Sequence, residues 1–135
     1  MNPITAQIDR HAQALSLLSE RQKVLASNIA NADTPGFQAR DFDFSQALEQ
    51  ARGNPSSSMS STIAKPTAPL AHDPGPNTPT VNLMWRTAGQ PTPDGNTVDL
   101  DRERANFSDN ALRYEATLRF INNDVKTILS AITGQ

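Results

Sequence analysis

Apolar residues in the first quarter of the chain recur in alternating steps of three and four, which is the spacing of one face of an α-helix. The pattern starts at Ile8 and reaches Ala32, and two polar residues, His11 and Gln22, interrupt it. This heptad spacing predicts a helix whose apolar stripe packs against a second helix.

Local signals mark both ends of this helix. Asn2 and Pro3 suit a cap and a first turn, because proline lacks the amide hydrogen that a first-turn position leaves unpaired. At the other end Pro35 disfavours helical angles at Thr34, and Gly36 accepts a positive φ. We therefore expect the helix to end near residues 31–33, and we assign residues 1–35 to it.

A second periodic stretch fills the C-terminal segment, residues 99–135, and it has no polar interruption. Asp99 is a candidate cap and Gly134 a natural stop. A helix over residues 101–132 would be about 48 Å long at 1.5 Å per residue, which is longer than a compact domain of this size requires. The stretch consists of Phe107, Ala111, Tyr114, Leu118, Ile121, Val125, Ile128 and Ile132.

Two long helices at the ends of a short chain predict an all-α protein in which they form an antiparallel coiled-coil pair. One such contact cannot bury every apolar side chain, so we expect neighbouring subunits to cover the rest and the free chain to be partly disordered. We place the contact at Leu15, Leu18, Leu25, Ile29, Tyr114, Leu118, Ile121, Val125 and Ile128. The residues left for neighbours are Leu17, Val24, Leu112, Phe120 and Leu129.

The segment between the helices has a different composition. Residues 36–52 predict a turn and a short helix from Phe44 to Arg52, whereas residues 53–98 hold eight of the ten prolines and many Ser, Thr and Gly residues. Such a composition is typical of a disordered connector, or of one that becomes ordered on binding. The exception is the strand-like run Val81–Arg86, which could form a small irregular β-hairpin with the turn at Pro93–Asn96. Trp85 would then anchor the hairpin or a partner interface.

Composition limits the possible partners. A net charge of -2 gives no general electrostatic affinity for nucleic acid. We expect neither a secretory signal peptide nor a membrane span, because the N-terminal residues lack a basic start and no apolar run reaches about 18 residues. Few aromatic residues and a mean hydropathy of -0.53 indicate a thin core that depends on surface buried against neighbours.

No catalytic or cofactor-binding constellation is visible. His11 and His72 lie in different segments, and phosphate-cradling or zinc-binding motifs are absent from the sequence. We therefore expect no enzyme activity, no cofactor and no metal. Two acidic pairs lie at the starts of predicted helices: Asp41 with Asp43, and Asp99 with Asp101. We interpret them as caps, because carboxylates there accept hydrogen bonds from the unpaired backbone amides of the first turn.

The run SNIANADTPGFQARD holds the most specific motif. Asn28 and Asn31 are three residues apart and share a helical face, so their amides can bond the chain where it turns at Thr34, Pro35 and Gly36, with Phe37 packing back on the helix. The string from residue 26 to residue 37 resembles the N-terminal signature of the bacterial flagellar axial proteins of the rod, hook and filament junctions. Residues 93–132 also look like the C-terminal helix of proximal rod subunits.

The resemblance implies a structural subunit of the flagellar basal-body rod. Such a subunit would be exported by the flagellar type III system and would polymerise through its terminal helices in the periplasm, linking the membrane ring to the distal rod. Its partners would be further copies of itself, other rod subunits, membrane-ring and ring–rod junction proteins, and the export gate. The short middle segment fits a proximal rod subunit, because hook and distal rod proteins carry additional domains.

In this family an aromatic residue followed four positions later by an aliphatic one is implicated in docking at the export gate, and Phe44 and Leu48 match that pattern. A short amphipathic helix burying both side chains explains them equally well, and both roles can hold at different times. The competing function is a soluble helical-hairpin export chaperone or adaptor. It fits the periodicity but does not account for the motif.

Overall fold

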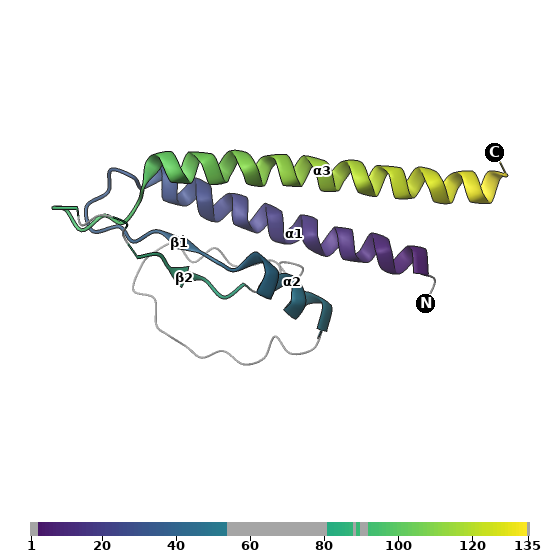
Figure 1. The fold of residues 1–135 in the computed structure, drawn as a ribbon, viewed down its shortest axis with the longest axis horizontal. Helices are drawn as coiled ribbons and strands as arrows, with labels where there is room; N and C mark the ends of the chain where they lie inside the picture. The colour runs from purple at the N-terminus through teal and green to yellow at the C-terminus, as the bar shows by residue number, and fades with distance from the viewer. Residues whose placement is uncertain (1–2, 54–80, 88, 90–91, 135) are drawn as a thin grey trace.

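The computed structural model describes residues 3–53, 81–87, 89 and 92–134 (Figure 1). Most of them are helical. The elements in chain order are α1 (Pro3–Ala30), β1 (Arg40–Asp41), α2 (Phe44–Gly53), β2 (Met84–Trp85) and α3 (Leu100–Thr133).

The two long helices, α1 and α3, run antiparallel and pack along most of their length, so that the start of α1 and the end of α3 lie on the same side of the molecule (Figure 1). At 1.5 Å per residue, the 28 residues of α1 extend about 42 Å and the 34 residues of α3 about 51 Å. The predicted fold class, mainly helical with paired terminal helices, is confirmed.

The helix ends follow the local signals. Residues 31–33 form a turn directly after α1. Asp99 is the N-cap of α3, where its side chain accepts a hydrogen bond from the Arg102 amide, and Gly134 closes the helix at φ 75 with its N–H donating to Ser130. Capping groups of this kind satisfy backbone donors and acceptors that a helix end leaves open.

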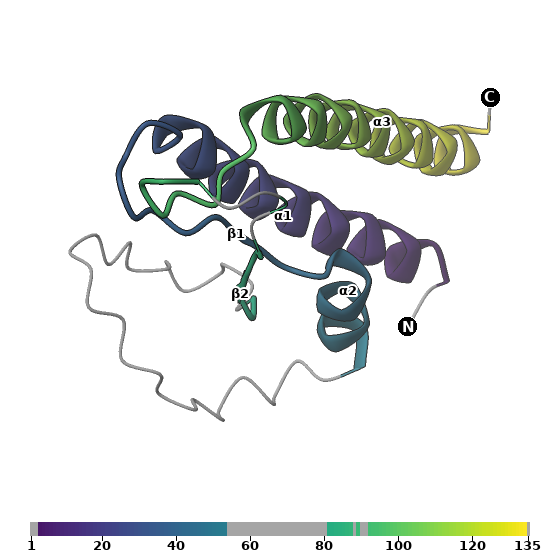
Figure 2. The same cartoon turned by 60° about the vertical axis from the view of Figure 1, so that its left-hand side comes forward.

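A third layer lies against one side of the helix pair. The chain reverses after α1, and residues 37–53, which we call the arm, run back along α1 through β1 and α2 (Figures 1 and 2). The buried apolar core forms where the arm meets the helices. Its members are Leu17, Leu18, Val24, Leu25, Ala39 and Phe42.

The arm corrects one expectation from the sequence. Leu17 and Val24 were expected to be covered by neighbouring subunits, yet both are buried within the chain. Leu17 lies about 100° around the helix from Leu18, on a side of α1 away from α3, and α1 is in contact with both β1 and α2. The arm therefore supplies the cover that a two-helix scheme lacks.

The strand-like run contains β2. It pairs with β1 and does not form a hairpin with the turn at residues 93–96. The two strands pair antiparallel, with Arg40 opposite Trp85 and Asp41 opposite Met84. The hairpin expected within residues 81–96 is thus replaced by a ribbon between the arm and a segment more than 40 residues later. The expected disorder concerns the connector at residues 53–98, of which residues 54–80, 88 and 90–91 lie outside the described part of the chain.

The two acids of the first expected capping pair act differently. Asp43 caps α2, with its Oδ1 accepting hydrogen bonds from the amides of Ser45 at 2.9 Å and Gln46 at 3.2 Å. Hydrogen bonding from the Ser45 side chain and these amides lowers the pKa of Asp43. Asp41 does not cap the helix, because its carboxylate binds two arginines.

Candidate functional site

The site predicted by the sequence motif is the corner at which α1 ends and the arm begins. Asn28, which is buried, holds the arm against α1 through both ends of its amide. Its Nδ2 donates to the Arg40 carbonyl at 2.7 Å, and its Oδ1 accepts from the Arg40 amide at 3.1 Å. The side chain therefore pairs with the backbone of β1 as a neighbouring strand would.

The rest of the motif shapes the turn itself. Asn31 Nδ2 donates to the Ser27 carbonyl at 2.8 Å, and Asn31 Oδ1 accepts from the Thr34 hydroxyl at 3.2 Å. Gly36 has φ 73, a left-handed conformation that favours glycine. Pro35 is exposed, whereas Phe37 is half-buried.

Asn96 completes the corner, and the sequence pattern did not single it out as a site residue. This buried side chain lies beneath the end of α1, and its Oδ1 accepts from the Val98 amide at 2.8 Å. Its Nδ2 contacts the carbonyls of Asn31 at 3.1 Å, Ala32 at 2.7 Å and Thr34 at 2.9 Å. Asn96 thereby gives the Ala32 carbonyl a donor and adds a second one to the carbonyls of Asn31 and Thr34, which also accept from the amides of Thr34 and Phe37.

Backbone contacts join the same two segments. The Gly36 amide donates to the Asp94 carbonyl at 2.8 Å, and the Thr97 amide donates to the Phe37 carbonyl at 3.0 Å. Gly95 has φ 73, and a Cβ added to it would lie 3.8 Å from the Gly36 Cα. The turn at residues 93–96 is thus a second layer of the corner. The turn residues themselves were a visible signal, but their partner was not.

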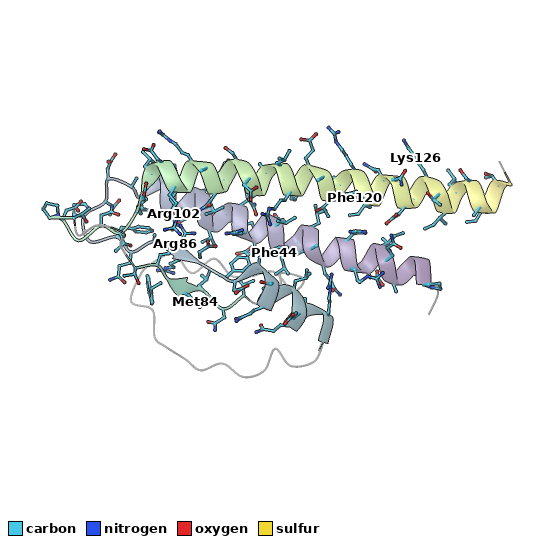
Figure 3. All side chains as sticks on the ribbon, in the orientation of Figure 1. Phe44, Met84, Arg86, Arg102, Phe120 and Lys126 are labelled. Carbon is cyan, nitrogen blue, oxygen red and sulfur yellow. The ribbon has the colours of Figure 1, made fainter. Side chains whose placement is uncertain are left out.

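Below the corner, a chain of charged side chains crosses all three layers. We call Arg21, Asp41, Arg86 and Glu103 the charge cluster. Arg21 donates to both carboxylate oxygens of Asp41, at 3.2 and 3.1 Å. Arg86 binds Asp41 with one guanidinium nitrogen and Glu103 with another. Figure 3 shows Arg86 beside the first turns of α3.

Glu103 is the most buried member of the charge cluster, with 1% of its surface exposed. Besides Arg86, it accepts a hydrogen bond from Asn28 Nδ2 at 3.1 Å, which links the charge cluster to the corner. Two arginines face two carboxylates, so the formal charges cancel. A buried carboxylate is tolerated when such partners surround it.

The pKa of Asp41 reflects the same partners. Burial raises the pKa of Asp41. Hydrogen bonds from Arg21 and the Phe42 amide, together with the positive charges of Arg21 and Arg86, outweigh that effect, so the net shift of the pKa is downward. Asp41 is therefore ionised at neutral pH. Both carboxylates of the charge cluster are bound by arginine, and the geometry is that of a structural clasp between α1, the arm, the segment after β2, and α3.

Apolar side chains remain on two outer surfaces. Leu83, Met84 and Trp85 are exposed, and the Arg40 guanidinium lies 4.5 Å from the centre of the Trp85 ring. On α3, Ile132 is 77% exposed and Leu129 60%. The other large apolar side chains exposed on α3 are Leu112, Leu118, Phe120 and Val125.

The expected helix contact is thus distributed unevenly. Leu18 and Leu25 are buried, but Leu118 and Val125 are exposed in the single chain because α3 turns polar residues toward α1. On the side of α1 away from Leu17 and Val24, Leu15 and Tyr114 line an open groove of about 250 Å³. The remaining predicted contact residues, Ile29, Tyr114, Ile121 and Ile128, are half-buried like Leu15.

The candidate export residues, Phe44 and Leu48, are half-buried on α2, where Phe44 is the first residue of the helix (Figure 3). Among the described residues, no group of three or more His, Asp or Glu side chains is placed to hold a metal ion. None of the described helices has a stretch apolar enough, over the length needed, to cross a bilayer.

Comparison with known proteins gives these features a context. A family model described as "Flagella basal body rod protein" matches residues 8–38, which cover most of α1 and the corner. The chain is 47% identical over 127 residues to the flagellar basal body rod protein FlgB of Yersinia ruckeri, covering 89% of this chain and 88% of that protein. It is 40% identical over 136 residues to FlgB of Escherichia coli K12, covering 98% and 96% respectively.

The paired terminal helices, the corner motif and these matches define a rod protein of the bacterial flagellar basal body. The chain belongs to the FlgB family of flagellar basal body rod proteins. It is accordingly a structural component of the rod.

Proposed function

We propose that this rod component is a proximal rod subunit, exported by the flagellar type III system and polymerised through its terminal helices. In that role it links the membrane ring to the distal rod within the periplasm. Its partners are other rod subunits, further copies of itself, and the ring and ring–rod junction proteins. A soluble export adaptor also fits the paired helices, but it does not account for the corner motif.

The observation that carries this proposal is the exposed apolar surface of α3. Leu129 and Ile132 lie near the end of a helix about 9 Å longer than its partner, and both are mostly exposed. Exposed apolar surface on a small protein marks an interaction site when several large side chains share it. In a polymer, helices of adjacent subunits would cover these residues.

The corner and the charge cluster support assembly by fixing the shape of each subunit. They tie the arm, the turn at 93–96 and both long helices into one unit before neighbours are added. A rigid subunit loses less conformational entropy on joining a polymer than a flexible one. The end of α3, which has few contacts within the chain, is the part we expect to become ordered on assembly.

The double variant Leu129→Ser/Ile132→Ser tests the assembly role. We expect this protein to be exported but absent from purified basal bodies, with motility lost, because the substitutions remove apolar contact without touching the core. Ser130→Ala/Thr133→Ala is the matched control at the same helix end and should assemble normally. Normal incorporation of the serine variant would refute the proposed use of this surface. A stable one-to-one soluble complex with another flagellar protein would favour the adaptor.

The export role assigned to Phe44 and Leu48 has a separate test. Both side chains are half-buried on α2 in the folded chain, so a gate would recognise them before folding. Phe44→Ala/Leu48→Ala should reduce the amount of subunit that leaves the cytoplasm, whereas Gln50→Ala, on an exposed position of α2, should not. Equal export of the two variants would assign both residues to packing alone.

A further inference from the structure

One heptad position of α3 is polar from Glu103 to Asp124. Four residues spaced seven apart turn toward α1, and two of them are the buried residues of the helix, Glu103 at 1% and Asn110 at 0% exposure. The other two are half-buried. We call these residues the polar row: Glu103, Asn110, Thr117 and Asp124.

Three members of the polar row contact polar groups of α1. Asn110 Nδ2 donates to the Leu18 carbonyl at 2.9 Å and to Gln22 Oε1 at 2.5 Å. Glu103 accepts from Asn28, as described above. At the far end, Asp124 Oδ1 accepts from Gln7 Nε2 at 3.4 Å, and its other oxygen lies 3.6 Å from His11 Nε2.

Each member of the polar row is followed in the sequence by a residue that lies about 100° further around the helix. They are Arg104, Ala111, Leu118 and Val125. Leu118 and Val125 are exposed, although burial of apolar surface alone would favour turning them toward α1. The observed rotation therefore places the polar row in the contact and leaves Leu118 and Val125 outside it.

We propose that the polar row sets the register and rotation of α3 on α1. It thereby keeps the apolar side of α3, by which we mean Leu118, Val125, Leu129 and Ile132, free for adjacent subunits. A slip of one heptad would place Glu103 near the Leu18 carbonyl and Gln22, where Asn110 now lies. Its carboxylate would then lose Asn28 and Arg86. A rotation that buries Val125 would withdraw Asn110 and Asp124 from their partners on α1.

The physical basis is selection among arrangements and not a gain in stability. A buried polar residue costs free energy relative to an apolar one, but it penalises every register in which its partners are missing. Asn110 Oδ1 has no hydrogen-bond partner among the described residues although it is buried, so this position is not optimised for stability. The two hydrogen bonds that Asn110 Nδ2 donates, to the Leu18 carbonyl and to Gln22, define where α1 must lie.

The substitution Asn110→Leu tests the proposal in the full chain, which has no cysteine and accepts labels at introduced sites only. Spin labels at Ala26→Cys and Asn122→Cys, both exposed positions, report the register through their mutual distance. A slip of one heptad moves one helix about 10 Å along the other. We expect one distance in the parent and a second, shifted population in Asn110→Leu.

Thiol labelling at Val125→Cys reports the rotation, with Leu112→Cys as the control. Leu112 lies on the far side of α3 from the contact and is exposed in either arrangement. We expect Asn110→Leu to slow labelling at position 125 several-fold and to leave position 112 unchanged. Asp124→Leu, at the other end of the polar row, should shift the rotation in the same direction.

A single unchanged distance in Asn110→Leu, together with unchanged labelling at position 125, would overturn the proposal. Loss of folded structure would also contradict it, because the proposal assigns Asn110 to selection. The use of the free apolar side rests on the proposed assembly function, but both measurements are made on the isolated chain. A failure of rod assembly would therefore leave this test intact, and the reverse is also true.

Discussion

Removal of Arg86 would separate the roles of its two carboxylate partners. In the variant Arg86→Met the apolar stem remains, but the positive charge between Asp41 and Glu103 is lost. Asp41 keeps both hydrogen bonds from Arg21. Glu103, which is 1% exposed, keeps only the hydrogen bond from Asn28. The cost therefore falls mainly on Glu103.

The size of the effect follows from that burial. Breaking a buried ion pair by removing one partner costs about 3–5 kcal/mol, because an uncompensated charge remains. The surviving Asn28 bond places this case near the lower end, about 3 kcal/mol. For a chain of this length that corresponds to a fall in the melting temperature of roughly 10 °C.

Urea unfolding of the full chain, followed by circular dichroism at neutral pH, measures this change. The matched control is Arg113→Met, which removes an exposed ion pair with Asp109 on the same helix and should cost less than about 0.5 kcal/mol. The double variant Arg86→Met/Glu103→Leu should recover most of the loss, since it removes the orphaned charge as well. The reasoning is refuted if Arg86→Met unfolds like the control, or if the double variant loses the sum of both single effects.

Four further outcomes are expected. Gly36→Val should impair rod assembly more than helicity, because φ 73 opposes a β-branched residue; motility and circular dichroism compare the two, and normal motility would argue against a constrained corner. Asn96→Ala should lower the free energy of unfolding by about 1–3 kcal/mol in urea, because the Ala32 carbonyl loses its donor and the Val98 amide loses its acceptor; an unchanged midpoint would remove Asn96 from the corner. Asp41 has a lowered pKa when folded, so its stabilisation is present above its ordinary value of 3.8 and is lost as the pH falls through the folded pKa; the difference in melting temperature between the parent and Asp41→Asn should shrink at acidic pH, and a pH-independent difference would contradict this. Circular dichroism of the dilute free chain should show less helix than the structure contains, with a dependence on concentration, whereas full helicity at every dilution would show that no order depends on assembly.

Local signals predicted the long elements well. Pro35 and Gly36 end α1, Asp99 and Gly134 bound α3, and the two heptad patterns predict helices that pair. Each of these signals acts between residues a few positions apart. Helix periodicity and capping are properties of a short stretch, so a single sequence is enough to recognise them.

The remaining features depend on contacts between distant segments. Asn96 meets the end of α1 across more than 60 residues, and Arg86 joins Asp41 and Glu103 although each lies in a different element. Nothing in the spacing of Leu17 and Val24 shows that the arm covers them. The sequence shows the residues of the polar row but not their contact with α1, because the apolar stripe beside them has the same heptad period and itself predicts an interface.

The central claim is that each chain pairs its own terminal helices in this register and leaves the apolar side of α3 to its neighbours. Imaging of isolated basal bodies at side-chain resolution tests it most directly. The account predicts α1 and α3 antiparallel with Asn110 beside Gln22, and Leu129 and Ile132 buried against helices of adjacent subunits. Rod subunits in which those two side chains face solvent, or in which α3 has left its own α1, would contradict it.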